Sequence, residues 1–172
     1  MSIEKKDVLK IDRIDTPIGT MVAVANENLL FLLEFEDKTR LTDEITHFTK
    51  KIKLNIAPGK TIITTSIKKE LAQYFKGNLP CFNTPFSMIG TLFQQTVWKA
   101  LSNIPSGETC SYAELAASIK HPTACRAVAR ANASNRLAIL IPCHRVINAN
   151  GQLGGYAGGL MRKSWLIEHE KK

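Results

Sequence analysis

The sequence has no apolar run long enough to cross a bilayer, and its first ten residues lack the hydrophobic core of a signal peptide. We therefore expect a cytoplasmic protein with no membrane partner. No two of its four cysteines form a Cys-x-x-Cys pair, and its four histidines make no recognisable metal-ligand pattern with them. The cysteines are accordingly expected to be reduced thiols rather than a disulfide framework.

Acidic residues are missing between Glu114 and Glu168, a stretch that carries seven basic residues. Residues 91–172 hold +6 of the net charge of +8, so the basic excess is concentrated in the second half. Charge of one sign fits a polyanionic partner, with nucleic acid as the first candidate. The alternative is a solvated basic face that binds nothing. The seven basic residues are Lys120, Arg126, Arg130, Arg136, Arg145, Arg162 and Lys163.

The first half of the sequence contains elements of a fold but no chemical motif. Residues 8–36 hold short apolar runs separated by turn residues, which predicts β-strands. Two amphipathic helices are predicted, over Leu41 to Ile52 and over Ile67 to Phe75, the second with Ser66 as its N-cap. Residues 77–90 are rich in Gly, Pro and Asn, which is typical of a linker. We therefore expect a scaffold domain over residues 1–85 and a second domain over residues 86–172.

The second domain is predicted to begin with three helices. Capping boxes at Thr91 and Ser111 begin the first two, and Thr123 is the expected cap of a third over residues 124–133. Two short helices across a tight break are typical of a helix-turn-helix. Many helical proteins without DNA-binding activity contain such a pair.

The predicted third helix combines small side chains with two arginines. Cys125, Ala127 and Ala129 would let the helix backbone approach a surface closely, while Arg126 and Arg130 could reach phosphates. Such a composition favours close contact with little base reading, because major-groove readers carry more Asn, Gln and Arg. An alanine-rich packing helix is the alternative.

A thiol and an imidazole follow each other at Cys143 and His144. They come directly after an aliphatic run and Pro142, and a glycine-rich loop follows them. This context indicates a candidate nucleophile with its base, the alternative being a structural cysteine beside an unrelated histidine. In the predicted terminal helix, Glu170 lies one turn after Leu166 and so could point inward, or it could be an exposed glutamate in a frayed end.

Five segments of the second half together resemble the O6-alkylguanine-DNA alkyltransferases. They are Phe93 to Trp98, Arg126 to Val128, Ile141 to Val146, Gly154 to Leu160 and Trp165 to Glu170. The resemblance implies an α+β fold, with a ribonuclease-H-like antiparallel sheet and helices in the first domain. A helical second domain would then contain a helix-turn-helix and the Pro-Cys-His-Arg active site.

The resemblance also assigns a role to each matching catalytic residue. It makes Cys143 the alkyl acceptor and His144 the base that ionises it through a water molecule. Glu170 would orient His144, and Tyr112 would donate a proton to the guanine oxygen. Cys143, His144 and Glu170 would then act as a nucleophile, a base and a carboxylate that orients the base, as in a catalytic triad. The base is needed because a thiol is mostly protonated at neutral pH.

The resemblance further implies residues that contact DNA and the extruded base. Arg126 would take the place of the flipped nucleotide, and Ala127 and Ala129 would lie close to the minor groove. Cys125 stands where a smaller residue is usual, and Ala157 where some members have a serine. The implied pocket residues are Tyr156, Val146, Ala157 and Asn135.

The expected activity is irreversible, single-turnover transfer of the alkyl group from O6-methylguanine in double-stranded DNA, with O4-methylthymine as a second candidate substrate. The expected protein is a monomer without a metal or organic cofactor. Two other functions compete with this one. A DNA-damage binder or helix-turn-helix regulator would not need the thiol, and a Cys-His hydrolase would turn over repeatedly and need an oxyanion hole.

Overall fold

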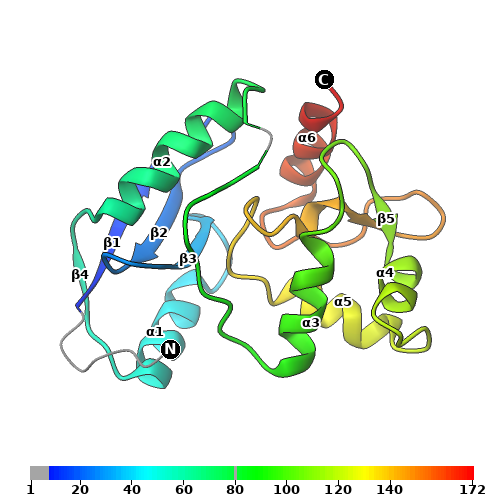
Figure 1. The fold of residues 1–172 in the computed structure, drawn as a ribbon, viewed down its shortest axis with the longest axis horizontal. Helices are drawn as coiled ribbons and strands as arrows, with labels where there is room; N and C mark the ends of the chain where they lie inside the picture. Colours follow the sequence, from blue (N-terminus) through cyan, green and yellow to red (C-terminus); the bar gives the residue numbers. More distant parts are fainter. Residues whose placement is uncertain (1–7, 80) are drawn as a thin grey trace. The chain divides into compact units, whose positions relative to one another are not determined.

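The computed structural model describes residues 8–79 and 81–172, and the chain divides into two compact units, Met1–Ser87 and Met88–Lys172 (Figure 1). The content is α+β, as predicted: a sheet with helices in the first unit and a mainly helical second unit. In the part of the chain that is described, no helix has both the length and the apolar character needed to cross a membrane.

The first unit is built on a four-stranded sheet. Its strands are β1 (Leu9–Ile14), β2 (Met21–Ala25), β3 (Leu30–Phe35) and β4 (Ile56–Pro58), in the order β3-β2-β1-β4. The first three pair antiparallel, as expected, but β4 pairs parallel to β1. Parallel pairing requires a crossover connection, and helix α1 (Leu41–Ile52) supplies it between β3 and β4.

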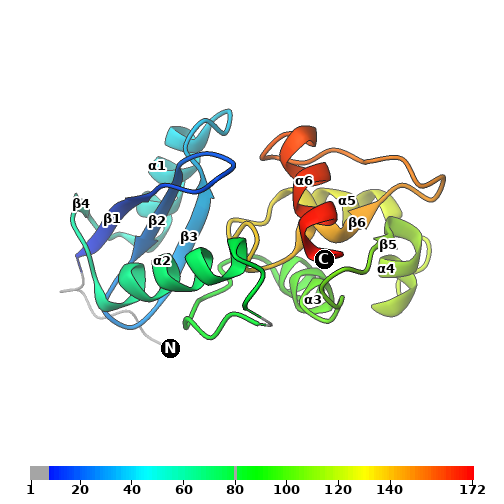
Figure 2. The same cartoon turned by 90° about the horizontal axis from the view of Figure 1, so that it is seen from above.

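Two helices cover the sheet from opposite sides, α1 on one and α2 (Ile62–Phe75) on the other (Figures 1 and 2). Every residue of β2 and β3 is consequently buried. Helix α1 has the predicted bounds, and its Phe48 packs against Phe31 of the sheet.

The start of α2 was predicted wrongly. The helix begins five residues before Ile67, because Thr61 and Thr64 form a reciprocal capping box. The residues from Ile62 to Thr65 are all β-branched and have low helix propensity, so propensity alone does not predict a helix start here. The Ser66 hydroxyl, which was the expected cap, instead hydrogen-bonds Thr84 Oγ1.

The second unit contains four α-helices, a 3-10 turn and a short strand pair. In chain order these are α3 (Leu92–Leu101), β5 (Cys110–Ser111), α4 (Tyr112–Ser118), α5 (Cys125–Ala133), η1 (Cys143–Arg145), β6 (Val146–Ile147) and α6 (Leu160–Glu170). Both predicted capping boxes are confirmed, at Thr91 and at Ser111. The predicted cap of α5 is wrong: the N-cap position is Ala124, and no side chain caps the helix.

Helices α3, α4 and α5 pack on one another, and α4 with α5 form the predicted helix pair. The indole Nε1 of Trp98 on α3 donates to the carbonyl of Ala131 on α5 at 2.8 Å. Val128 and Ala131 are buried, as the sequence predicted, so the opposite side of α5 is left facing outward.

The aliphatic run before Cys143 is a buried turn and not a strand. Asn135 replaces the missing sheet partners: its Oδ1 accepts from the Leu137 amide at 2.9 Å, and its Nδ2 donates to the Ile141 carbonyl at 2.9 Å. Ile139 has a left-handed backbone with φ of 70°, which is uncommon for a β-branched residue. A buried side-chain amide thus shapes the turn that leads into η1.

Candidate active site

The strand pair β5–β6 brings together two parts of the chain that are far apart in sequence. Cys110 pairs with Val146 and Ser111 with Ile147, in parallel. Because Tyr112 follows β5 directly and η1 precedes β6 directly, the start of α4 lies beside the Cys-His-Arg turn. Helix α6 packs against η1 and completes the site.

The sulfur of Cys143 is buried, with 7% of the residue exposed, and it faces Asn135. Asn135 Nδ2 donates to Sγ at 3.1 Å, and Asn132 Nδ2 donates to the Cys143 carbonyl at 3.4 Å. Both asparagines are themselves buried, so a thiolate at this position would receive a fixed donor in place of water.

The imidazole of His144 is fully buried and lies against the carboxylate of Glu170, with 2.9 Å between Nε2 and Oε1. A carboxylate can only accept, so Nε2 carries the proton and Nδ1 has the lone pair. Nδ1 is buried and has no hydrogen-bond partner within residues 8–79 and 81–172. Burial lowers the pKa of His144, against the opposing effect of Glu170, which keeps the imidazole neutral and able to accept a proton.

Arg145 binds the Glu170 carboxylate as well, through a contact that the sequence analysis did not predict. Its Nε donates to Glu170 Oε2 at 2.7 Å and its second terminal nitrogen to Oε1 at 2.9 Å. The remaining terminal nitrogen donates to the carbonyl of Ile104. Burial alone would raise the pKa of Glu170, but hydrogen bonds from His144 and Arg145 hold it well below its usual range.

Lys163 is the second functional candidate that sequence reasoning missed. Its side chain is fully buried, and Nζ donates to the carbonyls of Gly154 at 3.1 Å and Gly155 at 3.4 Å. Burial lowers the pKa of its ammonium group, and the Cys143 sulfur opposes that shift. Lys163 lies seven residues before Glu170, which is about two helical turns, so both residues fall on the same face of the helix. This spacing was the signal available in the sequence.

Tyr112 is half-buried at the start of α4. Burial raises the pKa of its hydroxyl, the Cys143 sulfur adds to the shift, and Asn132 opposes it. The glycine-rich loop approaches the ring closely: a Cβ on Gly154 would lie 3.0 Å from the tyrosine oxygen. Tyr112 is therefore held as a neutral donor between the loop and the thiol.

The remaining predicted residues have different surroundings. Val146 is buried in β6, Tyr156 is half-buried in the loop, and Ala157 is exposed. On α5, Arg126 is exposed, whereas Cys125, Ala127 and Ala129 are half-buried. The part of α5 that is not fully buried thus includes an arginine and three small side chains.

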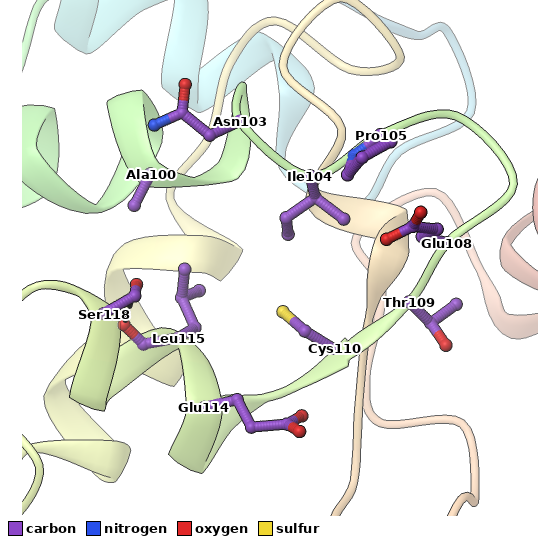
Figure 3. Close-up of a pocket in the computed structure, with 10 residues that line it drawn as sticks. All are labelled: Ala100, Asn103, Ile104, Pro105, Glu108, Thr109, Cys110, Glu114, Leu115 and Ser118. Atoms are coloured by element: carbon purple, nitrogen blue, oxygen red, sulfur yellow. Dashed lines mark hydrogen bonds between the residues drawn. The ribbon is translucent and has the colours of Figure 1, made fainter.

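A hollow of about 420 Å³ opens elsewhere in the second unit, between the end of α3, β5 and α4 (Figure 3). The sulfur of Cys110 points into it, and the catalytic candidates do not line it. Burial raises the pKa of the Cys110 thiol, and Glu114 adds to the shift. A second cysteine therefore lies in an accessible hollow, but in surroundings that oppose ionisation.

Neither a disulfide nor a metal site occurs in the part of the chain that is described. All four cysteines are free thiols. The side chains of residues 8–79 and 81–172 contain no group of three or more His, Cys, Asp or Glu that could hold a metal ion.

The chain is similar to proteins of one family over most of its length. Residues 92–172 match the family model of the 6-O-methylguanine DNA methyltransferase DNA-binding domain. The methylated-DNA–protein-cysteine methyltransferase of Mycobacterium bovis is 43% identical, over 92% of this chain and 90% of its own. The Shigella flexneri protein of the same name is 39% identical, over 92% and 94%. A crystal structure of Mycobacterium tuberculosis OGT in complex with DNA superposes with a TM-score of 0.81 at 41% identity, covering 94% of this chain and 92% of that one. The chain belongs to the methylated-DNA–protein-cysteine methyltransferase family.

Proposed function

We propose that this protein repairs DNA by transferring the alkyl group of O6-methylguanine to Cys143, once per molecule. The observation that carries the proposal is the buried Glu170–His144 pair directly beside a thiol that receives a hydrogen bond from Asn135. A structural cysteine would need neither a carboxylate-oriented imidazole nor an amide donor aimed at its sulfur.

Ionisation of the thiol is the first step. His144 Nδ1 takes the Cys143 proton through a water molecule. The proton on Nε2 stays on that nitrogen and remains hydrogen-bonded to Glu170. The imidazolium that forms is stabilised by the ionised carboxylate, and the thiolate by Asn135. A histidine buried in its neutral form is a suitable base for this transfer.

Methyl transfer is an in-line displacement at carbon. The Cys143 sulfur forms the new S–C bond as the C–O6 bond of the base breaks. Tyr112 donates its proton toward the departing base, and the tyrosinate is neutralised by the proton that His144 holds. The raised pKa of Tyr112 keeps that proton in place until the leaving group needs it. Guanine and a methyl thioether are the products.

A thioether has no good leaving group, so the reaction stops after one turnover. Neither redox chemistry nor metal-bound water is needed at any step. This predicted stoichiometry separates the alkyltransferase from a Cys-His hydrolase, whose acyl-enzyme would be hydrolysed and which would turn over repeatedly.

Double-stranded DNA carrying the lesion is the proposed partner, bound by the chain as a monomer in the cytoplasm. The sulfur of Cys143 is buried, so the base has to leave the stack to reach it. Exposed Arg126 on α5 is suited to fill the space in the duplex, and Ala127 and Ala129 to allow close contact with the minor groove. Val146, Tyr156 and Ala157 are proposed to surround the flipped base, and O4-methylthymine is proposed as a second substrate.

The division of labour follows the two units. Met88–Lys172 carries every residue proposed to act on DNA, and Met1–Ser87 supplies the scaffold proposed for residues 1–85.

A transfer assay tests the proposal. Duplex DNA containing O6-methylguanine is incubated with the protein and then analysed for restored guanine. We expect restoration by the wild-type chain and by Cys110→Ser, and none by Cys143→Ser. DNA binding that stays equal in all three chains without any restored guanine would favour a damage binder instead.

A further inference from the structure

Arg145 occupies a position in the site that the proposed mechanism leaves unused. Its guanidinium meets both oxygens of Glu170, and its third nitrogen is fixed on the Ile104 carbonyl after α3. The Glu170 side chain is 2% exposed, so this two-pronged pair is shielded from solvent screening. The carboxylate is therefore shared between an arginine and the catalytic histidine.

Sharing the carboxylate has a chemical consequence for the base. A carboxylate whose only partner is an imidazole stabilises the imidazolium and makes the histidine more basic. A base that is already protonated cannot take the thiol proton. The charged groups that face His144 are Glu170 and Lys163 from α6 and Arg145 from its own turn, with the Cys143 sulfur and Tyr112 on the thiol side. Two cations thus oppose one carboxylate, and Arg145 is the one bonded to it.

We propose that Arg145 is a positioning residue that fixes the Glu170 carboxylate for His144 and offsets its charge, so that His144 remains the neutral base at physiological pH. The inference rests on the proposed function and adds a determinant of its pH dependence. The Oε1 atom shows the arrangement directly, because it accepts from both His144 Nε2 and Arg145 at 2.9 Å. The Ile104 contact fixes the guanidinium from a second element, so the geometry does not depend on η1 alone.

The test compares Arg145→Gln and Arg145→Lys with the wild type in single-turnover transfer at saturating lesion DNA, from pH 5.5 to 9. In Arg145→Gln, the full charge of Glu170 acts on His144, and we expect the acid-side midpoint of the rate profile to rise by about one unit. Because burial lowers the pKa of His144 from its ordinary value in the wild type, the rate should fall most at the acid end of this range, by up to about tenfold, and recover toward pH 9. Arg145→Lys keeps the charge but loses the two-pronged contact, so its midpoint should stay in place while its plateau falls several-fold. Arg136→Gln, which removes an arginine whose guanidinium donates to the Ile89 carbonyl, controls for the effect of one lost positive charge on DNA binding.

The outcomes are distinguishable. If both Arg145 variants reduce the rate by the same factor at every pH, the arginine is only structural and the inference is overturned, while the proposed function stands. If Arg145→Gln does not fold, Arg145→Lys decides: an unchanged plateau would overturn the positioning role. A wild-type protein that binds lesion DNA but transfers nothing would remove the proposed function and this inference together.

Discussion

Asn135 Nδ2 donates to the sulfur of Cys143 at 3.1 Å, and the same side chain builds the buried turn that precedes it. One residue therefore links the fold of the second unit to its reactivity. A donor held by the Leu137 and Ile141 backbone cannot rotate away when the thiol ionises.

Replacing Asn135 by Ala should affect both properties. Loss of a hydrogen bond to a charged group costs about 1.5–3 kcal/mol, which predicts transfer slower by roughly 10- to 100-fold. The midpoint of thermal unfolding should also fall, because the buried Leu137 amide and Ile141 carbonyl lose their partner. Single-turnover kinetics and calorimetry measure the two effects, and Asn150→Ala in the exposed loop is the control. Wild-type kinetics in Asn135→Ala would show that the sulfur does not need this donor.

The close approach of the loop to Tyr112 gives a matched pair of glycine variants. A Cβ on Gly154 would lie 2.9 Å from ring carbon Cε2 and 3.0 Å from the hydroxyl of Tyr112, whereas a Cβ on Gly155 would meet nothing within 4 Å. Gly154→Ala should displace the tyrosine and slow transfer at least tenfold, by analogy with the loss of a general acid. Gly155→Ala should leave the rate within about twofold, since it changes a free surface. Equal rates in the two variants would contradict the placement of Tyr112.

The Nζ donor of Lys163 should hold the glycine-rich loop in place, an effect that a side chain of similar volume without a donor would not have. Lys163→Met keeps the apolar stem and removes the donor to the carbonyls of Gly154, which is buried, and Gly155, which is exposed. We expect the loop to become sensitive to limited proteolysis and transfer to slow by about tenfold, since each lost contact of this kind costs about 1–3 kcal/mol. Lys171→Met, at an exposed terminal position, is the control. Unchanged proteolysis in Lys163→Met would show that the loop is held by other contacts.

The first unit should have its own pH dependence, through buried Glu34. Burial raises the pKa of Glu34 to about 7, against the lowering effect of Lys38, whose Nζ lies 2.7 Å away. Between its ordinary value and about 7, the folded state therefore binds a proton that the unfolded state has lost, and stability falls as pH rises through this window.

Glu34→Gln removes the titrating group but keeps an oxygen facing Lys38. Urea unfolding from pH 5 to 8 should show the wild type losing on the order of 2 kcal/mol and Glu34→Gln losing much less. Glu36→Gln, at a more exposed carboxylate, should follow the wild type. A variant that loses as much stability as the wild type would show that another group titrates in this range.

The sequence predicts local features well where one signal controls them. Capping boxes at Thr91 and Ser111, the bounds of α1 and the inward face of α5 follow from spacing alone. The start of α2 was missed because it lies in a run of β-branched residues with low helix propensity. The capping box at Thr61 stabilises the helix there in spite of that propensity. The continuous aliphatic run before Cys143 fits either a buried strand or another core segment, because hydrophobicity alone cannot reveal that the Asn135 amide bonds the backbone of a turn.

The resemblance to a family predicted which residues belong to the candidate site. It did not predict the contacts that these residues make. Cys143, His144 and Glu170 were expected together. Arg145 and Lys163 were seen only as part of a basic stretch, because net charge does not show which cations are buried. Their roles depend on how α6 packs against η1, a contact between segments about 25 residues apart for Arg145 and Glu170.

Intact-mass analysis of the whole chain, after incubation with an excess of duplex DNA containing O6-methylguanine, tests the central claim most directly. The account predicts that every chain gains one methyl group and no more, and that peptide mapping locates it on Cys143 and not on Cys110. A chain that binds this DNA yet keeps its original mass, or that carries its methyl group on another residue, would contradict the account.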